Sequence, residues 1–426
     1  MAKLTIHMKR LFILLVITLI STNSVYSQKL LIHMDQAQSD HLKAYGIVYW
    51  SIENGQTIDW LLNYRGGSFI GDYSDKLAAE CRIRGVSFET LTEASAQSIY
   101  QEVQSENVNM DVVKLEKVPK IAVYAPTGSQ PWDDAVRLAL DYAEVKHDLI
   151  YDEEVLEGKL KDYDWVHLHH EDFTGQYGRF WGTQRNQPWY IQQVALNEAL
   201  ASKLGFSKVS QMKLAVAKTL REYIAGGGYM FAMCSAPDSF DVALAAEGVD
   251  ICESMFDGDP ADRSANNKLD FSKTIAFENF KLEMNPSVYE ISSIDVGPTS
   301  IANPEQDWFT LFEFSAKYDP VPTMLTQNHE GIIHGFLGQT TGFKKETVKK
   351  SVTILGEREG TNEVKYIYSN FGRGFFTFYG GHDPEDYRHG LFDPITELKL
   401  HTNSPAYRLI LNNILFPAAK KKEQKT

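Results

Sequence analysis

The chain has 426 residues, with 42 Lys and Arg, 56 Asp and Glu, and only 3 Cys, and its formal charge is −14. This length permits two or three domains with ample buried core, and three cysteines are too few for a disulfide scaffold. The acidic balance argues against nucleic acid and against an anionic membrane surface as partners, because both require clustered Lys and Arg.

The first 27 residues have the three-part layout of a secretory signal peptide. Lys3, Lys9 and Arg10 precede the apolar run 11–20, and a polar stretch leads to a possible cleavage site before Gln28. That run is too short to cross a bilayer core, which needs roughly 20 residues. We therefore expect an exported protein, periplasmic or extracellular, with no membrane span after cleavage and a formal charge of −17. The alternative is an uncleaved N-terminal anchor.

Residues 28–117 are predicted to form a small α/β extension. Strand candidates lie at 30–34 and 58–64, and helical patterns at 39–53, 75–84 and 89–105. Because strands and helices alternate, we expect a mainly parallel sheet. Pro119 lies in a plausible boundary at residues 116–120.

Residues 118–417 are predicted to form a larger α/β domain, and residues 418–426 a basic tail. Strand candidates lie at 121–124, 149–151, 164–170, 229–233, 351–355, 364–369 and 374–379, and helices at 153–160, 209–225, 238–247 and 406–415. A further helix is expected to start near Pro131. The alternation over residues 118–170 is typical of a doubly wound sheet. Two insertions, the aromatic-rich residues 171–206 and the less regular residues 253–345, interrupt the pattern.

Cys234 gives the strongest functional signal, because it lies between the apolar strand 229–233 and a predicted helix. Alanine stands two residues away on each side, and small neighbours are what a tight strand-to-helix elbow requires. Such an elbow exposes the thiol at the carboxyl edge of the sheet, points the N–H of Ser235 at a developing oxyanion and favours the thiolate. The alternative is that Cys234 is a buried apolar cysteine.

His382 gives the second signal. It follows strand 374–379 and precedes Asp383 and Glu385. A thiol nucleophile needs a base, and the base needs an orienting carboxylate. The segment supplies both if its strand neighbours the elbow strand, but His382 could equally be a capped loop histidine.

Together these segments resemble the class I glutamine amidotransferase-like superfamily, whose Gly-x-Cys-x-Gly elbow is relaxed here to Ala-Met-Cys-Ser-Ala around Cys234. The resemblance covers residues 118–252 and 365–416. It implies a flavodoxin-like, doubly wound, mainly parallel sheet with Cys234 as nucleophile, His382 as base and Glu385 (or Asp383) as orienting carboxylate.

Two features depart from the family pattern. The glycine-rich oxyanion loop after the third strand is replaced by His169-His170-Glu171-Asp172, so Glu171 and Asp172 join Ser235 as oxyanion or substrate-binding candidates. The elbow also resembles the trehalose-utilisation-type branch, in which a His-Ser-Ala segment stands at the position of Cys234.

His167 and His169 give a third signal, because alternate residues of a strand share one face. Two imidazoles with carboxylates nearby could ligate zinc or another transition metal, and this hypothesis requires both rings to converge with Glu171, Asp172 or His382. The alternative is a polar strand end. Spacing fixes no third and fourth ligand, so no cofactor is predicted. The acidic loop 257–262 lacks the ligand spacing of a calcium loop.

The sequence therefore predicts an exported Cys-dependent hydrolase or amidase that acts on an amide or ester in a small-molecule, peptide or carbohydrate ligand. One alternative is a non-catalytic or trehalose-utilisation-type carbohydrate-binding protein, whose aromatic insertion would stack on the ligand. The other is a metal-dependent site at His167 and His169. The motifs give no support to an asparagine synthetase, because no Cys follows Met1 and the Ser-Gly-Gly-x-Asp-Ser loop is absent.

Overall fold

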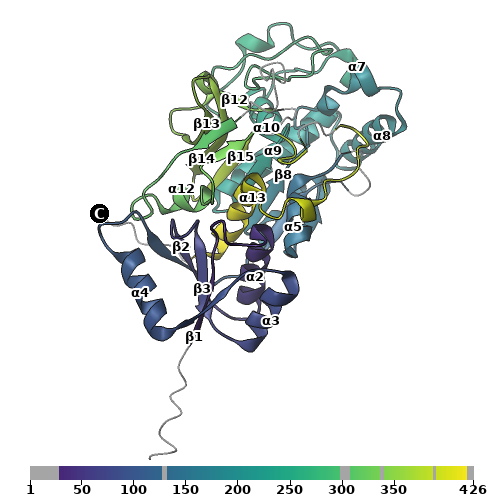
Figure 1. The fold of residues 1–426 in the computed structure, drawn as a ribbon. Coiled ribbons are helices and arrows are strands. Elements are labelled where there is room, and N and C mark those ends of the chain that lie inside the picture. The colour runs from purple at the N-terminus through teal and green to yellow at the C-terminus, as the bar shows by residue number, and fades with distance from the viewer. Residues whose placement is uncertain (1–27, 127–131, 298–307, 336–339, 387–389, 420–426) are drawn as a thin grey trace, which may run out of the picture.

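The computed structural model describes residues 28–126, 132–297, 308–335, 340–386 and 390–419, which form two sheets with helices packed on them (Figure 1). The predicted signal peptide at residues 1–27 lies outside the described residues, as do residues 420–426 of the basic tail. In the part of the chain that the structure describes, no helix has both the length and the apolar character needed to cross a membrane.

The N-terminal sheet has five strands in the order β4-β1-β3-β2-β5. These are β1 (Gln28–Ile32), β2 (Ile58–Leu62), β3 (Ser68–Asp72), β4 (Glu89–Thr92) and β5 (Asp111–Leu115). Every neighbouring pair in this order is antiparallel, so the prediction of a mainly parallel sheet is wrong. The sequence pattern missed β3, which follows β2 after a short turn, and such hairpins are antiparallel.

Three helices cover the N-terminal sheet: α2 (His41–Glu53), α3 (Asp75–Arg84) and α4 (Glu93–Gln104). Each begins where a side-chain oxygen accepts a backbone N–H of the first turn, from Asp40, Ser74 and Thr92 respectively. Helix α3 ends at Gly85, whose φ of 73° closes the helix in the left-handed conformation.

The second sheet has ten strands, in the order β11-β10-β13-β14-β15-β9-β8-β6-β7, with β12 paired to β14. The strands are β6 (Ile121–Tyr124), β7 (Asp148–Ile150), β8 (Trp165–Leu168), β9 (Tyr229–Met233), β10 (Trp308–Leu311), β11 (Ile332–His334), β12 (Phe343–Lys344), β13 (Thr353–Arg358), β14 (Glu363–Phe371) and β15 (Gly374–Tyr379). Strands β7, β6, β8, β9 and β15 are parallel to one another, whereas every pairing from β15 to β11 is antiparallel.

The expectation of a flavodoxin-like, doubly wound, mainly parallel sheet is therefore wrong. Among the described residues, five pairings of this sheet are antiparallel and four are parallel. Strands β10, β11 and β12 lie within residues 253–345, where the sequence shows little periodicity. Strands β13 and β14 are joined by a short hairpin, which forces them to be antiparallel.

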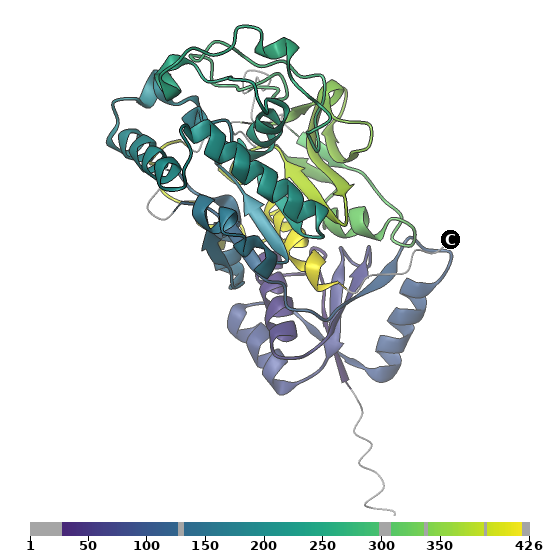
Figure 2. The same ribbon diagram turned by 180° about the vertical axis from the view of Figure 1, so that it is seen from behind.

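Helices cover both faces of the parallel strands. Ile121 and Val123 of β6 pack with α5 (Ala135–Ala143) and α13 (Pro405–Leu415), and the alternate residues Ala122 and Tyr124 pack on the opposite side. This alternation is the two-residue period of a strand that is buried on both faces. The opposite side is covered by α6 (Asp152–Leu156), α9 (Val209–Ala225) and α10 (Ala236–Ala245) (Figure 2).

The two predicted insertions contain regular structure. Residues 171–206 hold α7 (Trp181–Gln184) and α8 (Pro188–Lys203), and residues 253–345 hold α11 (Ser254–Asp257) and α12 (Pro320–Leu325) besides β10 to β12. Pro188 opens α8 at a position where its missing N–H costs no hydrogen bond.

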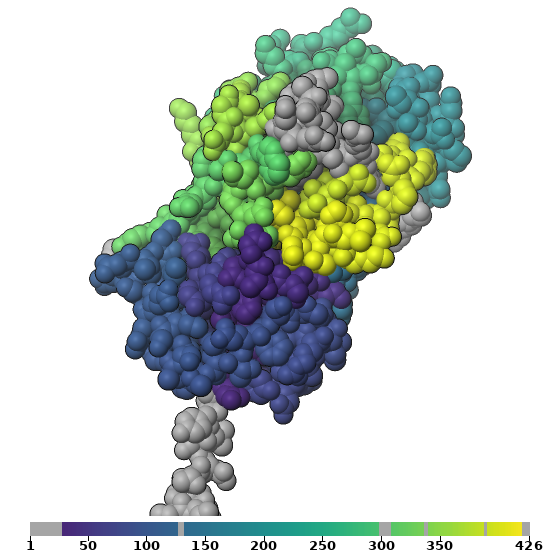
Figure 3. All heavy atoms as spheres, viewed as in Figure 1, coloured from purple at the N-terminus to yellow at the C-terminus, as the bar shows by residue number. Residues whose placement is uncertain are grey.

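The C-terminal segment lies against the N-terminal part of the molecule, where yellow and purple spheres touch in Figure 3. Helix α13 contributes Arg408, which is fully buried and donates to the carbonyl oxygens of Met34 and Gly66. One hydrophobic core includes residues of both sheets together with α2, α5 and α13. The N-terminal sheet and the C-terminal helix α13 are thus packed into a common core.

Candidate functional site

The residues singled out by sequence follow three adjacent parallel strands. His169 and His170 follow β8, Cys234 follows β9, and His382 follows β15 three residues after its end. Strands β9 and β15 are direct neighbours, which meets the condition that the sequence placed on His382. Two backbone hydrogen bonds connect the three strand ends: Cys234 N–H donates to the Gly381 carbonyl at 3.0 Å, and Ala236 N–H donates to the His169 carbonyl at 3.2 Å.

Cys234 has a left-handed backbone conformation, with φ of 54°. That conformation costs an L-residue roughly 1–2 kcal/mol, and such strain persists where the surrounding structure holds it. Here the hydrogen bond to Gly381 holds one side and α10, which starts two residues later, holds the other. Gly381 itself has φ of 119°, which a residue with a Cβ rarely adopts. The Cys234 side chain is buried, with 5% of the residue exposed.

The two carboxylates predicted to orient His382 have other partners. Glu385 pairs with His401, with 3.2 Å between its Oε2 and the ring Nδ1. Asp383 is buried and accepts hydrogen bonds from the Tyr407 hydroxyl at 3.0 Å and the Thr396 hydroxyl at 2.6 Å. These contacts give both side chains structural partners, and an orienting role for Glu385 or Asp383 stays a prediction.

The predicted oxyanion and substrate-binding residues, Ser235, Glu171 and Asp172, lie in different environments. Ser235 is the residue before α10 and is 1% exposed. Asp172 accepts the backbone N–H groups of Thr174, Gln176 and Gly178 and thereby shapes the loop after β8.

Glu171 belongs to a different environment from its neighbour Asp172. It accepts a hydrogen bond from the Tyr151 hydroxyl at 3.0 Å and lies 3.9 Å from Lys213 Nζ. Burial raises the pKa of Glu171 to about 7. Lys213 in turn pairs with the fully buried Asp152 at 2.9 Å, so Glu171 ends a buried polar network on the α9 side of the sheet.

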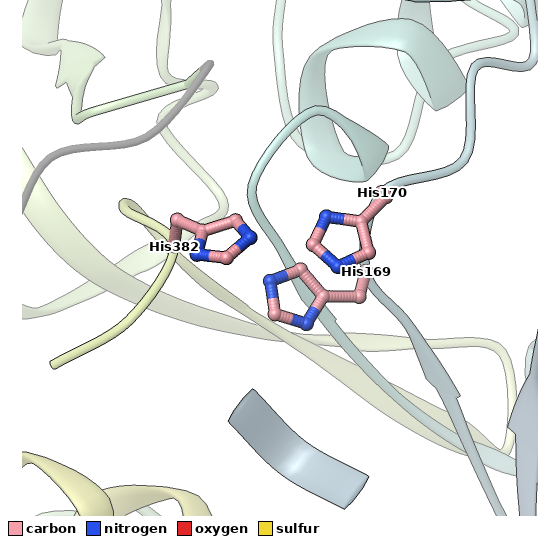
Figure 4. Close-up of side chains that lie close together, drawn as sticks. All are labelled: His169, His170 and His382. Atoms are coloured by element: carbon pink, nitrogen blue, oxygen red, sulfur yellow. The ribbon is translucent and has the colours of Figure 1, made fainter. Parts of the chain in front are cut away.

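Three imidazoles come together at this edge of the sheet: His169, His170 and His382 (Figure 4). One nitrogen of each ring lies within 4.8 Å of the corresponding nitrogens of the other two. The ring centroids of His169 and His170 are 3.9 Å apart with nearly parallel planes, and the His382 centroid lies 5.0 Å and 4.7 Å from them. We call this group the edge cluster. His169 and His382 were predicted as site residues for separate reasons, and His170 stood out in the sequence only as part of the loop after the third strand.

Asp134 supports the edge cluster from the start of α5. Its Oδ1 accepts the backbone N–H groups of Val136 and Arg137, and it lies 3.2 Å from His167 Nε2 and 3.2 Å from His169 Nδ1. Burial opposes ionisation of this carboxyl, but the two imidazoles outweigh burial and hold the pKa of Asp134 well below its usual range.

His167 does not join the edge cluster. It shares a face with His169, as strand alternation predicts, but its Nδ1 faces the Phe231 carbonyl at 3.3 Å and its Nε2 faces Asp134. Both ring nitrogens are thereby occupied. Burial lowers the pKa of His167, against the opposing effect of Asp134. The structure brings His167 and His169 together at Asp134, where the three side chains form a group that could hold a metal ion, and not at Glu171, Asp172 or His382. A metal site at this pair stays a prediction, and of the two rings only His169 also lies in the edge cluster.

Aromatic side chains border the edge cluster. The Trp132 ring lies 5.4 Å from His170, 5.7 Å from Phe180 and 5.3 Å from Trp189. Other aromatics of the predicted insertion, Phe173 and Tyr190 among them, are buried in the core. Some aromatic side chains of the insertion therefore pack in the core, and others lie beside His170.

The three cysteines form no disulfide. Burial raises the pKa of the Cys81 thiol to about 12, and burial also raises the pKa of Cys252 well above its usual value. Cys252 Sγ lies 3.2 Å from the Thr174 carbonyl. Neither thiol has the surroundings of a reactive cysteine.

No family model matches this chain, and no curated protein matches it. Among solved structures it is similar to the cytoplasmic protein STM3548 from Salmonella typhimurium, at 9% identity and a TM-score of 0.34, over 71% of this chain and 100% of that chain. It is also similar to the cytoplasmic protein STM1381 from Salmonella typhimurium LT2, at 9% identity and a TM-score of 0.33, with the same coverage. Similarity at this level supports no inference about function.

Proposed function

We propose that this protein is a thiol hydrolase that cleaves amide or ester bonds, with Cys234 as nucleophile and His382 as base. The observation that carries the proposal is the left-handed backbone of Cys234, with φ of 54°, between a buried strand and the first turn of α10. Strained residues of this kind concentrate at functional sites, and a nucleophile elbow is a known instance.

The proposed reaction uses residues that lie at neighbouring strand ends. His382 follows Gly381, whose carbonyl accepts the Cys234 N–H. The imidazole would take the thiol proton, the sulfur would attack the substrate carbonyl, and the same imidazole would protonate the leaving group. Water would then release the acyl group from sulfur. The ten-residue helix α10 favours the thiolate through its N-terminal dipole.

The three cysteines of the chain allow an internal comparison of reactivity. We expect iodoacetamide to alkylate Cys234 in the folded, metal-free protein much faster than Cys81 and Cys252, whose thiols are protonated at neutral pH. Peptide mapping of the alkylated protein measures the three rates. Equal rates for the three cysteines would contradict the proposal.

Hydrolysis of a chromogenic nitrophenyl ester by the same metal-free protein tests the chemistry. We expect Cys234→Ala to reduce the rate at least 100-fold and the matched variant Cys252→Ala to leave it unchanged, since Cys252 lies in a separate apolar cluster. Full activity in Cys234→Ala would overturn the proposal.

A further inference from the structure

The edge cluster has the form of a ligand set. Its three imidazoles come from two strand ends, β8 and β15, and each turns a ring nitrogen toward the other two (Figure 4). His169 is 1% exposed. A tetrahedral metal with bonds of about 2.1 Å would draw such nitrogens to roughly 3.4 Å from one another, a short movement from their present spacing.

The hydrogen bonds of two rings fix which nitrogen carries the proton. His169 Nδ1 faces the Asp134 carboxylate, and His170 Nε2 faces the Asp133 carbonyl. Both partners only accept hydrogen bonds, so both of these ring nitrogens must donate. In the neutral form of each ring, His169 Nε2 and His170 Nδ1 are then the nitrogens that can bind a metal.

Within the described residues, His169 Nε2 is buried and has no hydrogen-bond partner. A buried polar atom without a partner destabilises the fold, and a cation placed among the three rings would supply that partner.

A carboxylate at the start of α5 supports the edge cluster. The ionised Asp134 stands behind His169, which is the carboxylate–histidine–metal arrangement that fixes the ligand ring and increases its basicity.

We propose that His169, His170 and His382 bind a divalent transition-metal ion of the zinc class, with Asp134 as the supporting carboxylate. Three imidazole nitrogens suit zinc, cobalt, nickel or copper, whereas magnesium and calcium require oxygen ligands. His167 is not a ligand, because both of its ring nitrogens are engaged. Three protein ligands leave a fourth position open for water or substrate.

The metal site does not rest on the proposed thiol chemistry. The two compete for His382, because a ring nitrogen bound to a metal cannot take the proton of Cys234. A bound metal is therefore expected to suppress thiol hydrolysis, and metal binding is measurable without any activity.

Zinc titration of the full chain, purified without a histidine tag and stripped with a chelator, tests the site by isothermal calorimetry. We expect one Zn²⁺ per chain, and binding about 100-fold weaker in His170→Ala, with metal content checked by elemental analysis. His329→Gln is the matched control, because His329 is also half of a stacked histidine pair but belongs to a different cluster. Absence of stoichiometric binding, or equal binding by wild type and His170→Ala, would overturn the proposal.

Cobalt spectroscopy keeps the test independent of how the variants fold. In the wild-type chain, Co²⁺ bound by three imidazoles and water should give visible absorption bands of a four- or five-coordinate site, and Zn²⁺ should displace them. Bands of a six-coordinate ion alone would contradict the site. Loss of hydrolysis in Cys234→Ala with normal zinc binding supports both proposals, whereas unchanged hydrolysis with normal zinc binding removes only the thiol reaction.

Discussion

Two histidine clusters in the described residues have similar ring geometry but differ in the charged group beside them. In the edge cluster, His169 and His170 stack with centroids 3.9 Å apart and planes 18° apart. In the second, which we call the interface cluster, His41 and His329 stack at 4.0 Å and 12° beside Arg408. Stacked imidazoles alone therefore do not define a metal site.

The two clusters differ in the groups that contact their ring nitrogens. In the interface cluster, His329 Nδ1 accepts a hydrogen bond from the Arg408 guanidinium at 3.1 Å, and His41 faces the Asn403 side chain and the Met34 carbonyl, each at 3.0 Å. The Arg408 guanidinium thus engages a His329 nitrogen that a metal would need. In the edge cluster, the Asp134 carboxylate lies beside His169 Nδ1, and His169 Nε2 is buried without a hydrogen-bond partner among the described residues. The second partner of each imidazole therefore distinguishes the two clusters.

Removal of the guanidinium should break the interface cluster and leave the edge cluster intact. Arg408 donates to the Met34 and Gly66 carbonyls and to the Tyr45 hydroxyl, so Arg408→Met leaves several buried acceptors without donors. We expect a loss of about 3–5 kcal/mol in the free energy of unfolding. Urea denaturation measures it, and the exposed Arg185→Met is the control, with an expected change within about 0.5 kcal/mol. Equal stability of the two variants would contradict the structural role.

The interface cluster should also make folding sensitive to acid. Burial, followed by the charge of Arg408, lowers the pKa of His41 from 6.5 to about 4. The pKa of His329 falls to about 3, from burial, His41 and Arg408. Between these values and 6.5 the unfolded chain binds more protons than the native chain, so stability is highest above pH 6.5 and falls as the pH decreases.

For His41 alone, this linkage corresponds to about 3 kcal/mol lost between pH 6.5 and pH 4. Denaturant titrations at several pH values should show a flatter pH dependence in His41→Gln than in wild type. Parallel curves for the two proteins would show that His41 is not kept neutral by the fold.

Substitution of Asp134, the supporting carboxylate, should have a smaller effect, on the metal affinity of the edge cluster. Asp134→Asn preserves a helix-capping oxygen but removes the negative charge behind His169, so we expect zinc affinity to fall roughly 10–100-fold with the fold unchanged. Calorimetric titration measures the affinity. Asp40→Asn is the matched control, because Asp40 caps α2 in the same way and its carboxylate accepts hydrogen bonds from the Lys43 N–H and the Tyr142 hydroxyl, which lie outside the edge cluster. An equal effect of both substitutions would assign Asp134 to capping alone.

The sequence predicted the parts of the site that depend on local pattern. Strand β9 and helix α9 have the bounds that periodicity and the glycine run predict, and the elbow at Cys234 follows from them. The pairing of strands was not predictable in the same way, because β10 to β12 are short segments in an irregular region and their partners lie far along the chain.

The sequence did not predict that the histidines of the edge cluster lie together, for the same reason. His169 and His382 are 213 positions apart, and the register of β8, β9 and β15 brings them together. The second partner of each ring, Asp134 or the Asp133 carbonyl, depends on how α5 begins, which sequence spacing does not determine. Orienting roles for Asp383 and Glu385 followed from adjacency in the chain, which does not reveal that Asp383 also contacts Thr396 and Tyr407 and that Glu385 also contacts His401.

The smallest expected effect concerns the backbone of Cys234. Glycine adopts φ of 54° without the steric penalty that a Cβ imposes, so Cys234→Gly should be more stable than Cys234→Ala by about 1 kcal/mol. Both variants lack the sulfur, so the difference isolates the backbone strain from the loss of side-chain packing. Chemical denaturation of the two variants measures it, and Cys252→Gly against Cys252→Ala is the control, because glycine lowers stability where the backbone is in an ordinary region. If both pairs showed alanine to be the more stable residue, the left-handed conformation of Cys234 would carry no strain, and the principal support for its role as a nucleophile would be lost.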